Sequence, residues 1–389
     1  GVEVLWRMAQ VPTFWELGKY GLVLMMVTGL VVRRRLSVPK LPLIYFAALI
    51  PSCVLALVIS DPVDAKDQLS FNMSGPLALV ISCCFFSQVR VTVTVIKNLL
   101  YAVIVPLVGI AFAAFFFTVT NEQIQFTTES NFATSGGFGP NQVSSVLGLG
   151  VFVTAGSLIL FKARWTVRAV LVALTLIFAG QSVMTFSRGG MYNAVGALLL
   201  LTLLHFRDIT QGLKRVVPLV AIVIIFVYVL FPALDVYTGG KLGERFNETD
   251  TTRRVDIVES DLEIFQENPV LGVGVGVARS YRKHFLEYSA ASHTELSRLI
   301  SEHGSLGLAA LLCLAAMGIL NVIGQRSTIG RALIAGAGVW SVLFMTNAGM
   351  RIAAPSFMLG LTCITLRPAR RLIKKRRALR TSESESQRS

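Results

Sequence analysis

The side chains best suited to chemistry gather in one polar segment, residues 235–304, of an otherwise apolar chain. This segment contains two adjacent arginines, Arg253 and Arg254, and a histidine, His293, while Arg188 lies upstream between two apolar runs. Guanidinium groups bind phosphate oxygens in pairs, and a neutral imidazole accepts a proton from a hydroxyl group. The segment together with Arg188 is therefore predicted to handle a phosphate-bearing lipid and a sugar hydroxyl.

Arg253 and Arg254 are predicted to open an amphipathic helix, with Thr251 or Thr252 as its N-cap. Its apolar stripe is predicted to comprise Val255, Val258, Leu262 and Phe265. Free N–H groups and the helix dipole make such a helix start a natural phosphate site, which two arginines strengthen. The alternative is an ordinary surface ion pair of Arg254 with Glu259 or with a neighbouring residue.

Ser292 and Glu295 match a capping box, which places His293 at the first position of a second helix. The positive end of the helix dipole should lower the pKa of His293 and keep it neutral, able to accept a proton. The alternative is an inert, exposed histidine. Glu295, and Glu302 and His303 farther along the same helix, are predicted as weaker, substrate-binding members of the site.

Arg188 is flanked by Ser187 and by the pair Gly189-Gly190, between two apolar runs. An arginine near membrane depth is costly, which predicts a functional role. The alternative is snorkelling of a long side chain to the membrane interface. The two glycines are expected to let a ligand approach the backbone.

Further polar residues complete the predicted site. Asn141 follows a Gly-Pro turn and either points into a polar cavity or caps a helix, two interpretations that the sequence leaves open. Arg351 follows another apolar run and is predicted to bind substrate. Asp61 and Asp64 form a conceivable metal pair, but a solvated acidic loop is the preferred interpretation. The glycine-rich run at residues 272–278 follows a helix, which favours a flexible turn over a dinucleotide-binding fingerprint.

The elements that must position these groups are membrane-spanning helices. The 389 residues are 53% hydrophobic and 15% charged, with a mean hydropathy of +0.65, whereas soluble domains carry about a quarter charged residues. The net charge of +14 does not indicate nucleic-acid binding, because the basic residues fall at the ends of apolar runs, as the positive-inside rule requires. The five cysteines lie in or beside apolar runs, which indicates neither a disulfide framework nor a metal site.

The predicted fold class is an all-α polytopic membrane protein with about eleven transmembrane helices and a large helical periplasmic loop. With every basic cluster in the cytoplasm the N-terminus lies outside, so a twelfth, preceding helix is expected in the full-length protein. The predicted parts are N-terminal transmembrane helices (1–234), a periplasmic catalytic loop (235–304), C-terminal transmembrane helices (305–367) and a basic, then polar, cytoplasmic tail (368–389).

Several motifs resemble the O-antigen ligase and polymerase superfamily of bacterial envelopes. They are S-R-G-G after one span, R-V-D-I-V and E-N-P-V-L-G-V-G in the loop, and H-T-E-L-S-R-L-I-S-E-H-G-S-L-G-L before the next span. By this resemblance Arg188 is the arginine of S-R-G-G. Arg254 is the arginine of R-x-D-x-W, with Val258 in place of the common aromatic. His293 is the histidine of H-N-x-x-L, with Thr294 in place of the usual asparagine.

The resemblance implies a glycosyltransferase of the bacterial inner membrane, working at its periplasmic face without cofactor or metal. It would move a glycan from undecaprenyl diphosphate to an acceptor hydroxyl, with the lipid-linked donor, a lipid or glycan acceptor and membrane lipids as partners. A repeat-unit polymerase of the same superfamily is the main alternative, because the donor chemistry is shared. A transporter of the same lipid is a second alternative, but it should place ionisable groups at mid-membrane depth and show repeated halves, which the sequence lacks.

Overall fold

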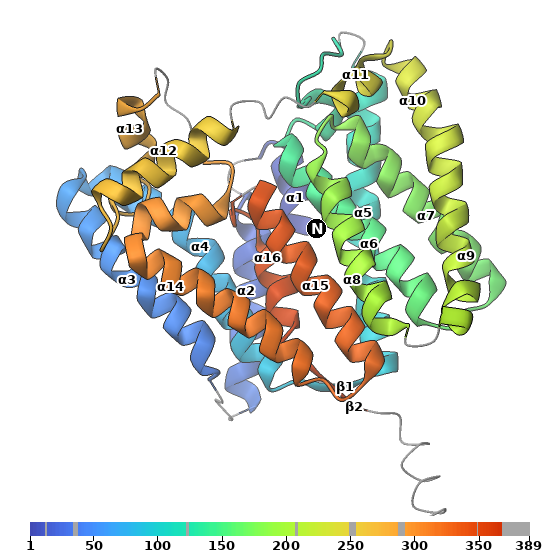
Figure 1. Cartoon of the computed structure of the whole chain (residues 1–389), viewed down its shortest axis with the longest axis horizontal. Helices are drawn as coiled ribbons and strands as arrows, with labels where there is room; N and C mark the ends of the chain where they lie inside the picture. The colour runs from blue at the N-terminus through green and yellow to red at the C-terminus, as the bar shows by residue number, and fades with distance from the viewer. Residues whose placement is uncertain are drawn as a thin grey trace, which may run out of the picture.

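A computed structural model describes residues 1–11, 14–33, 38–121, 124–206, 209–248, 254–286, 292–347 and 349–367. The chain forms a bundle of long helices with two short strands at one end (Figure 1). The first half comprises α1 (Val2–Met8), α2 (Leu17–Arg33), α3 (Lys40–Ile59), α4 (Pro62–Ser87), β1 (Arg90–Thr92), α5 (Val93–Thr120), the 3-10 turn η2 (Ala133–Ser135), α6 (Pro140–Leu160) and α7 (Trp165–Met184).

The second half begins with α8 (Gly189–His205) and one long helix divided into α9 (Ile209–Ile225), the π-helical η3 (Phe226–Leu230) and α10 (Phe231–Tyr237). It continues with α11 (Lys241–Asn247), α12 (Arg254–Glu267), α13 (Ala278–Tyr281), the 3-10 turn η4 (Arg282–His284), α14 (Glu295–Ile323), α15 (Thr328–Asn347), α16 (Ala353–Leu361) and β2 (Thr365–Arg367).

The all-α, polytopic prediction is confirmed. Eight helices in the described part of the chain are long and apolar enough to cross a bilayer, and α8 is a shorter apolar helix. Two further predicted spans of the eleven are also short, since α2 has 17 residues, as α8 does, and α16 has 9, against the roughly 20 that a bilayer core requires. The figure of eleven therefore stays a prediction.

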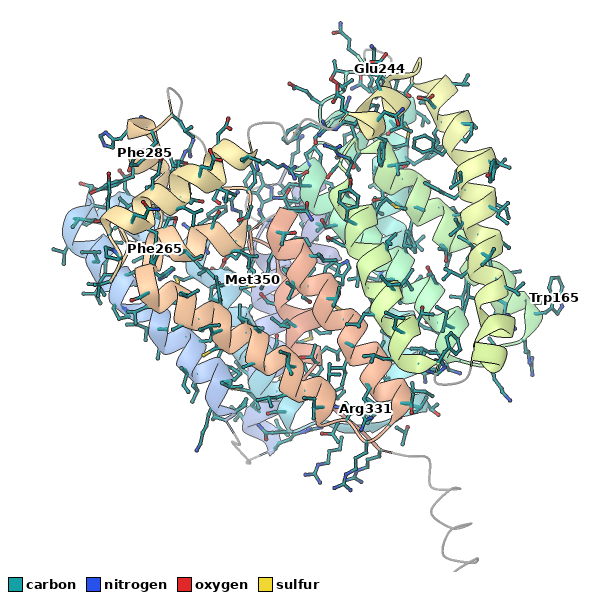
Figure 2. The ribbon with its side chains drawn as sticks, viewed as in Figure 1. Trp165, Glu244, Phe265, Phe285, Arg331 and Met350 are labelled. Carbon is teal, nitrogen blue, oxygen red and sulfur yellow. The ribbon has the colours of Figure 1, made fainter. Side chains whose placement is uncertain are left out.

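The two ends of the bundle differ in chemistry. The helices α11, α12 and α13 lie together at one end, which we call the polar end, and the parallel pair β1–β2 lies at the other, the strand end (Figure 1). Figure 2 places Glu244 and Phe285 at the polar end and Arg331 at the strand end. Arg33 reaches the strand end as well, because its Nη1 donates to the carbonyl of Gln88, just before β1. Arg33 and Arg331 thus lie at the strand end.

α6 is the central helix, and its most apolar stretch is completely buried among the surrounding helices. Small residues permit this close packing, as in many membrane helix pairs. A Cβ on Gly148 would lie 2.1 Å from the carbonyl oxygen of Gly190 in α8. The polar end of α6 therefore sits directly against the start of α8.

The acidic stretch after α3 is helical, so the predicted loop at residues 61–67 is wrong. Asp61 is the N-cap of α4, and its carboxylate accepts the N–H of Val63 at 2.9 Å. Capping satisfies a backbone donor that would otherwise lack a partner, and Pro62 suits the first helical position. This explains Asp61 without a metal ion.

The glycine-rich run forms a turn, as predicted, but the turn is anchored to α14. Val273 and Gly274 donate their N–H groups to the carbonyls of Ser301 and Glu302 in α14, each at 3.1 Å. Gly272 has a φ of 67°, and a Cβ there would lie 2.4 Å from the backbone of Glu302. Only glycine fits this contact. The buried position of Val273 and these bonds do not support the expected flexibility.

Candidate active site

The turn between α7 and α8 carries the S-R-G-G motif in a strained conformation. Phe186, which precedes it, has a φ of 58° and is fully buried. A bulky residue in the left-handed region is uncommon, and such strain tends to persist at functional sites. Arg245 of α11 donates from Nε to the carbonyl of Phe186 at 3.2 Å and holds the turn in place.

The two glycines of this motif serve helix packing, which corrects the expectation that they admit a ligand. Both are buried. A Cβ on Gly190 would lie 2.0 Å from the carbonyl oxygen of Ser144 in α6, and one on Gly189 would lie 3.0 Å from Asn347. The glycines let α8 pack closely against its neighbours, and this packing fixes the position of the Arg188 backbone.

Arg188 reaches across to the end of α11. Its Nη1 donates to the backbone carbonyl of Glu248 at 2.5 Å, and the carboxylate of Glu248 pairs with Arg245 at 3.4 Å. The guanidinium groups of Arg188 and Arg245 therefore converge on one residue.

Asn141 joins the S-R-G-G turn to α12. Its Oδ1 accepts the hydroxyl of Ser187 at 2.8 Å and Nη2 of Arg254 at 3.4 Å. Gly139 takes the N-cap position of α6, and Asn141 comes after Pro140 inside the helix. Of the two open interpretations, the structure thus supports a polar contact and not a cap.

Arg188, Arg245 and Arg254 form what we call the arginine cluster. Burial, then the charge of Arg245 and then that of Arg188 lower the pKa of Arg254. The described residues give Arg254 no carboxylate partner, so the alternative of an ion pair with Glu259 is wrong. Three guanidinium groups gathered in this way suit an anion. The predicted N-caps Thr251 and Thr252, and Arg253, lie outside the described residues.

The buried face of α12 differs from the predicted stripe. Its buried residues are Ile257, Ser260, Asp261 and Ile264. Val255 and Leu262, by contrast, are 45% and 43% exposed. The stripe prediction was wrong because it counted only apolar side chains, whereas the inward face contains a charged residue that has buried partners.

Asp261 is that residue, and sequence reasoning missed it. It is fully buried, accepts Nε of Arg282 at 2.8 Å, and accepts the hydroxyls of Ser297 at 2.6 Å and Ser292 at 3.3 Å. It thereby fixes the chain on both sides of His293. The spacing Ile257, Asp261, Ile264, an acid within an apolar helical stripe, was the signal that could have revealed it.

The predicted capping box does not form. α14 begins at Glu295 with Thr294 as its N-cap, whose Oγ1 accepts the N–H of Ser297 at 3.0 Å. Ser292 donates its hydroxyl to the carbonyl of Thr294 at 2.8 Å instead. Glu295 turns inward, pairs with Arg298 and accepts the N–H of Met350 at 3.1 Å. The buried ionic partners have outcompeted the local cap.

His293 therefore lies just before α14 and not inside it, with part of its surface exposed. Its pKa is lowered, as predicted, but by partial burial first, then by the charges of Arg254, Arg351 and Arg282. The nearby cations keep the imidazole neutral and able to accept a proton. His293 thus feels the charge of Arg254 in the arginine cluster and that of Arg351.

A family model described as O-antigen ligase matches residues 173–312. This stretch includes Arg188, Arg254 and His293. This part of the chain is similar to the O-antigen ligase family. The resemblance seen in the motifs is thereby confirmed. No curated protein matches the chain.

Three predicted residues of the O-antigen ligase segment are buried in the body of the protein. Glu295 and Glu302 flank Arg298, whose Nη1 lies 2.5 Å from Glu302. His303 is fully buried, with Nδ1 against the hydroxyl of Ser52 in α3. This gives Glu295 and His303 a structural role, which the sequence pattern did not distinguish from substrate binding.

Two predicted residues lie outside the matched O-antigen ligase stretch but close to it in space. Asn141 contacts Arg254, as described above. Arg351 donates from Nη2 to the carbonyl of Ser292 at 3.4 Å, and its own carbonyl accepts Nη2 of Arg7 at 3.4 Å. The tertiary structure thus extends the candidate site to α6 and to the α15–α16 turn.

Proposed function

We propose that this protein transfers a glycan from undecaprenyl diphosphate to an acceptor hydroxyl at the periplasmic face of the bacterial inner membrane. One observation carries the proposal: Asn141 contacts both Ser187 of S-R-G-G and Arg254 of the loop motif. Two O-antigen ligase motifs, distant in sequence, meet at a cluster of cations. That cluster suits a diphosphate.

The arginine cluster would bind the diphosphate and stabilise the charge that develops on it. The acceptor oxygen attacks the anomeric carbon of the donor glycan, and the bond from that carbon to the diphosphate oxygen breaks with its electron pair. Arginine donors aimed at the departing oxygens favour this step. The proton of the acceptor hydroxyl passes to His293, whose lowered pKa leaves it neutral beforehand.

The membrane arrangement follows from the charges. We place residues 235–304 at the periplasmic face as the catalytic loop, residues 1–234 and 305–367 in the membrane, and the tail from 368 in the cytoplasm. The basic residues gathered at the strand end support this orientation. The described residues contain no group of three His, Cys, Asp or Glu side chains placed to hold a metal, and we propose no metal or cofactor role.

The direct test incubates the purified protein with an undecaprenyl-diphosphate-linked oligosaccharide and candidate acceptors and separates the products by size. A single addition to the acceptor supports the ligase reaction. A ladder of repeat units assigns the same site to a polymerase. Donor binding with no product, under conditions in which flipping of the lipid is detected, contradicts both and favours transport.

A further inference from the structure

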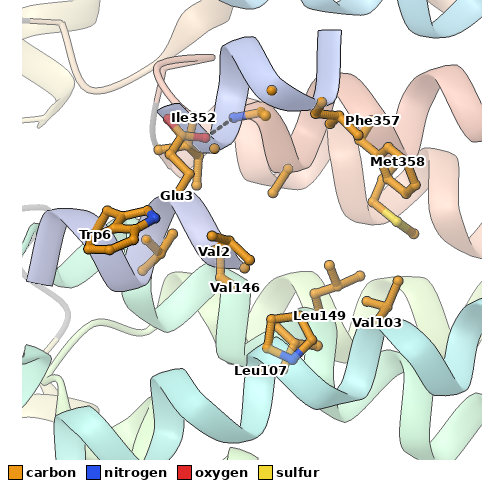
Figure 3. A pocket seen from close by; sticks show the side chains of 18 of the residues that line it. Val2, Glu3, Trp6, Val103, Leu107, Val146, Leu149, Ile352, Phe357 and Met358 are labelled. Atoms are coloured by element: carbon orange, nitrogen blue, oxygen red, sulfur yellow. Dashed lines mark hydrogen bonds between the residues drawn. The ribbon is translucent and has the colours of Figure 1, made fainter. Parts of the chain in front are cut away.

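A cavity of about 750 Å³ is lined by Ser292, the residue that precedes His293. We call it the polar pocket. Its walls come from the start of α2 and the residues before it, from α4, from the polar segment and from the α15–α16 turn, and the residues that matter here are Trp15, Tyr20, Phe71, Arg282, Ser292 and Arg351. It differs from the apolar groove of about 370 Å³ in Figure 3, where Glu3 is the charged residue and binds the N–H of Ala353.

Two arginines of the polar pocket are held by carboxylates. Arg282 is buried and bound by Asp261, and Arg298 is buried between Glu295 and Glu302. Their charges are compensated and their side chains fixed. They form a rigid polar wall that positions other groups but leaves little charge for a ligand.

Arg351 is different, because the described residues give it no carboxylate within ion-pair distance. It contacts the carbonyl of Ser292 and lies over the ring of Phe71, 5.3 Å from the centroid. Burial and then the charge of Arg298 lower its pKa, although Glu295 and Glu302 act in the opposite direction. Its backbone is anchored by Arg7. A positioned guanidinium without a paired acid suits an anionic ligand.

The remaining walls suit a sugar ring. Trp15, Tyr20 and Phe71 are 39%, 48% and 41% exposed, so their rings are open to a ligand. Aromatic faces provide apolar contact for the C–H face of a sugar, while Asp67 and Gln68 of α4 accept hydrogen bonds from its hydroxyls. A lipid chain, by contrast, matches the apolar groove.

We propose that the polar pocket binds the acceptor saccharide and that Arg351 selects acceptors carrying a carboxylate or phosphate group. The placement supports this role, which rests on the proposed function. Ser292 lines the pocket and is followed by His293, and the positive charge of Arg254 in the arginine cluster acts on His293 together with that of Arg351. Donor and acceptor would then meet at one base.

The test measures binding of small saccharides without any donor lipid, so it does not depend on transfer. The purified protein in lipid nanodiscs is titrated with a uronic acid disaccharide and its neutral reduced counterpart, and with glucose 6-phosphate and glucose. Quenching of Trp15 fluorescence reports binding, with Trp15→Phe as the signal control. An anionic probe should bind about tenfold more tightly than its neutral partner, the effect of one charge-assisted hydrogen bond. The two pairs distinguish carboxylate from phosphate.

Matched variants test whether Arg351 is the residue that causes the preference for anionic sugars. Arg351→Gln should abolish the preference and leave the neutral sugars bound, and Arg351→Lys should keep part of it. Phe71→Ala should weaken the anionic and the neutral sugars alike. Lys283→Gln is the control, because Lys283 is exposed at the same end without lining the pocket, and it should keep the full preference.

Three outcomes overturn the proposal. These are equal affinity of the wild type for all four sugars, an equal loss in Lys283→Gln and Arg351→Gln, or unchanged binding in Phe71→Ala. If Arg351→Gln does not fold, as judged by size-exclusion chromatography, the wild-type comparison and Arg351→Lys decide. A separate transfer assay tests the same point. Equal transfer rates with neutral and anionic acceptors would contradict the proposed selectivity but not the proposed reaction.

Discussion

At Arg188 and Arg254 the shape of the side chain should matter as much as its charge. A guanidinium makes two parallel hydrogen bonds to a phosphate group, which lysine cannot do. Arg188→Lys and Arg254→Lys should therefore each reduce glycan transfer about a hundredfold, nearly as much as alanine, because each loses one contact to a developing charge. Initial rates with a lipid-linked donor measure this. Near-normal rates in both lysine variants would make these arginines structural.

His293 should be needed for transfer but not for donor binding. General base assistance contributes about a hundred- to ten-thousandfold, so His293→Ala should nearly abolish product formation. The arginine cluster remains, so the variant should still bind the donor lipid, as measured by co-purification. The side chain packs into no buried cluster, so folding should be intact. Loss of donor binding would reassign His293 as a phosphate ligand, and normal transfer would leave it without a chemical role.

The pH dependence of glycan transfer should reflect the lowered pKa of His293. The pKa of His293 is lowered below its ordinary value of 6.5, so the neutral form persists as the solution becomes mildly acidic. The rate should stay level from alkaline pH down through that value and fall only as the pH passes below the lowered pKa, where protonation removes the base. Rates under saturating donor report it. A decline already complete at the ordinary histidine pKa would contradict the proposed environment.

At the scale of elements, α12 matters as a support for the segment that precedes α14. Asp261→Asn leaves Arg282 as a buried charge without its carboxylate, which typically costs about 3–5 kcal/mol. The variant should unfold at a clearly lower temperature in detergent. Asp256→Asn is the matched control, an exposed acid of the same helix that should change stability by no more than about 0.5 kcal/mol. Equal effects of the two substitutions would remove Asp261 from its supporting role.

The element boundaries also explain where His293 sits. Glu295 is drawn inward by Arg298 and by the N–H of Met350, so α14 starts two residues later than a capping box at Ser292 predicts. The first turns of α14 belong to this buried network, and the helix is interrupted at Gly304, which has a φ of 60°. The membrane-spanning part follows that break. His293 therefore remains outside the helix, on an exposed part of the chain.

At the scale of the whole molecule the orientation in the membrane is the main expectation. An impermeant maleimide applied to spheroplasts should label Asp256→Cys in α12 but not Arg326→Cys between α14 and α15, both exposed positions. The second should react only after the membrane is opened. The five native cysteines are replaced first to remove background. The reverse labelling pattern would place the polar end in the cytoplasm and contradict the proposed reaction site.

The amino-acid sequence alone sufficed for the fold class. Long apolar runs bounded by basic residues have few stable structures besides spanning helices, because lipid offers backbone groups no hydrogen-bond partners. Local motifs likewise marked Arg188, Arg254 and His293, since each is recognisable from its neighbours in the chain. Two local predictions were wrong. The acidic stretch was predicted as a loop but is helical, because Asp61 caps α4. The buried face of α12 was predicted as apolar but contains Asp261, because that carboxylate has a buried ionic partner.

The assembly of the site needed the folded chain. Asn141 and Arg254 meet although they are 113 residues apart, and Arg351 reaches the carbonyl of Ser292 over 59 residues. No local pattern encodes such contacts, because they arise from how α6, α8 and α14 pack against one another. The start of α14 was settled in the same way. A buried guanidinium must be paired, and that requirement exceeds the free energy of about 1 kcal/mol that an N-cap contributes.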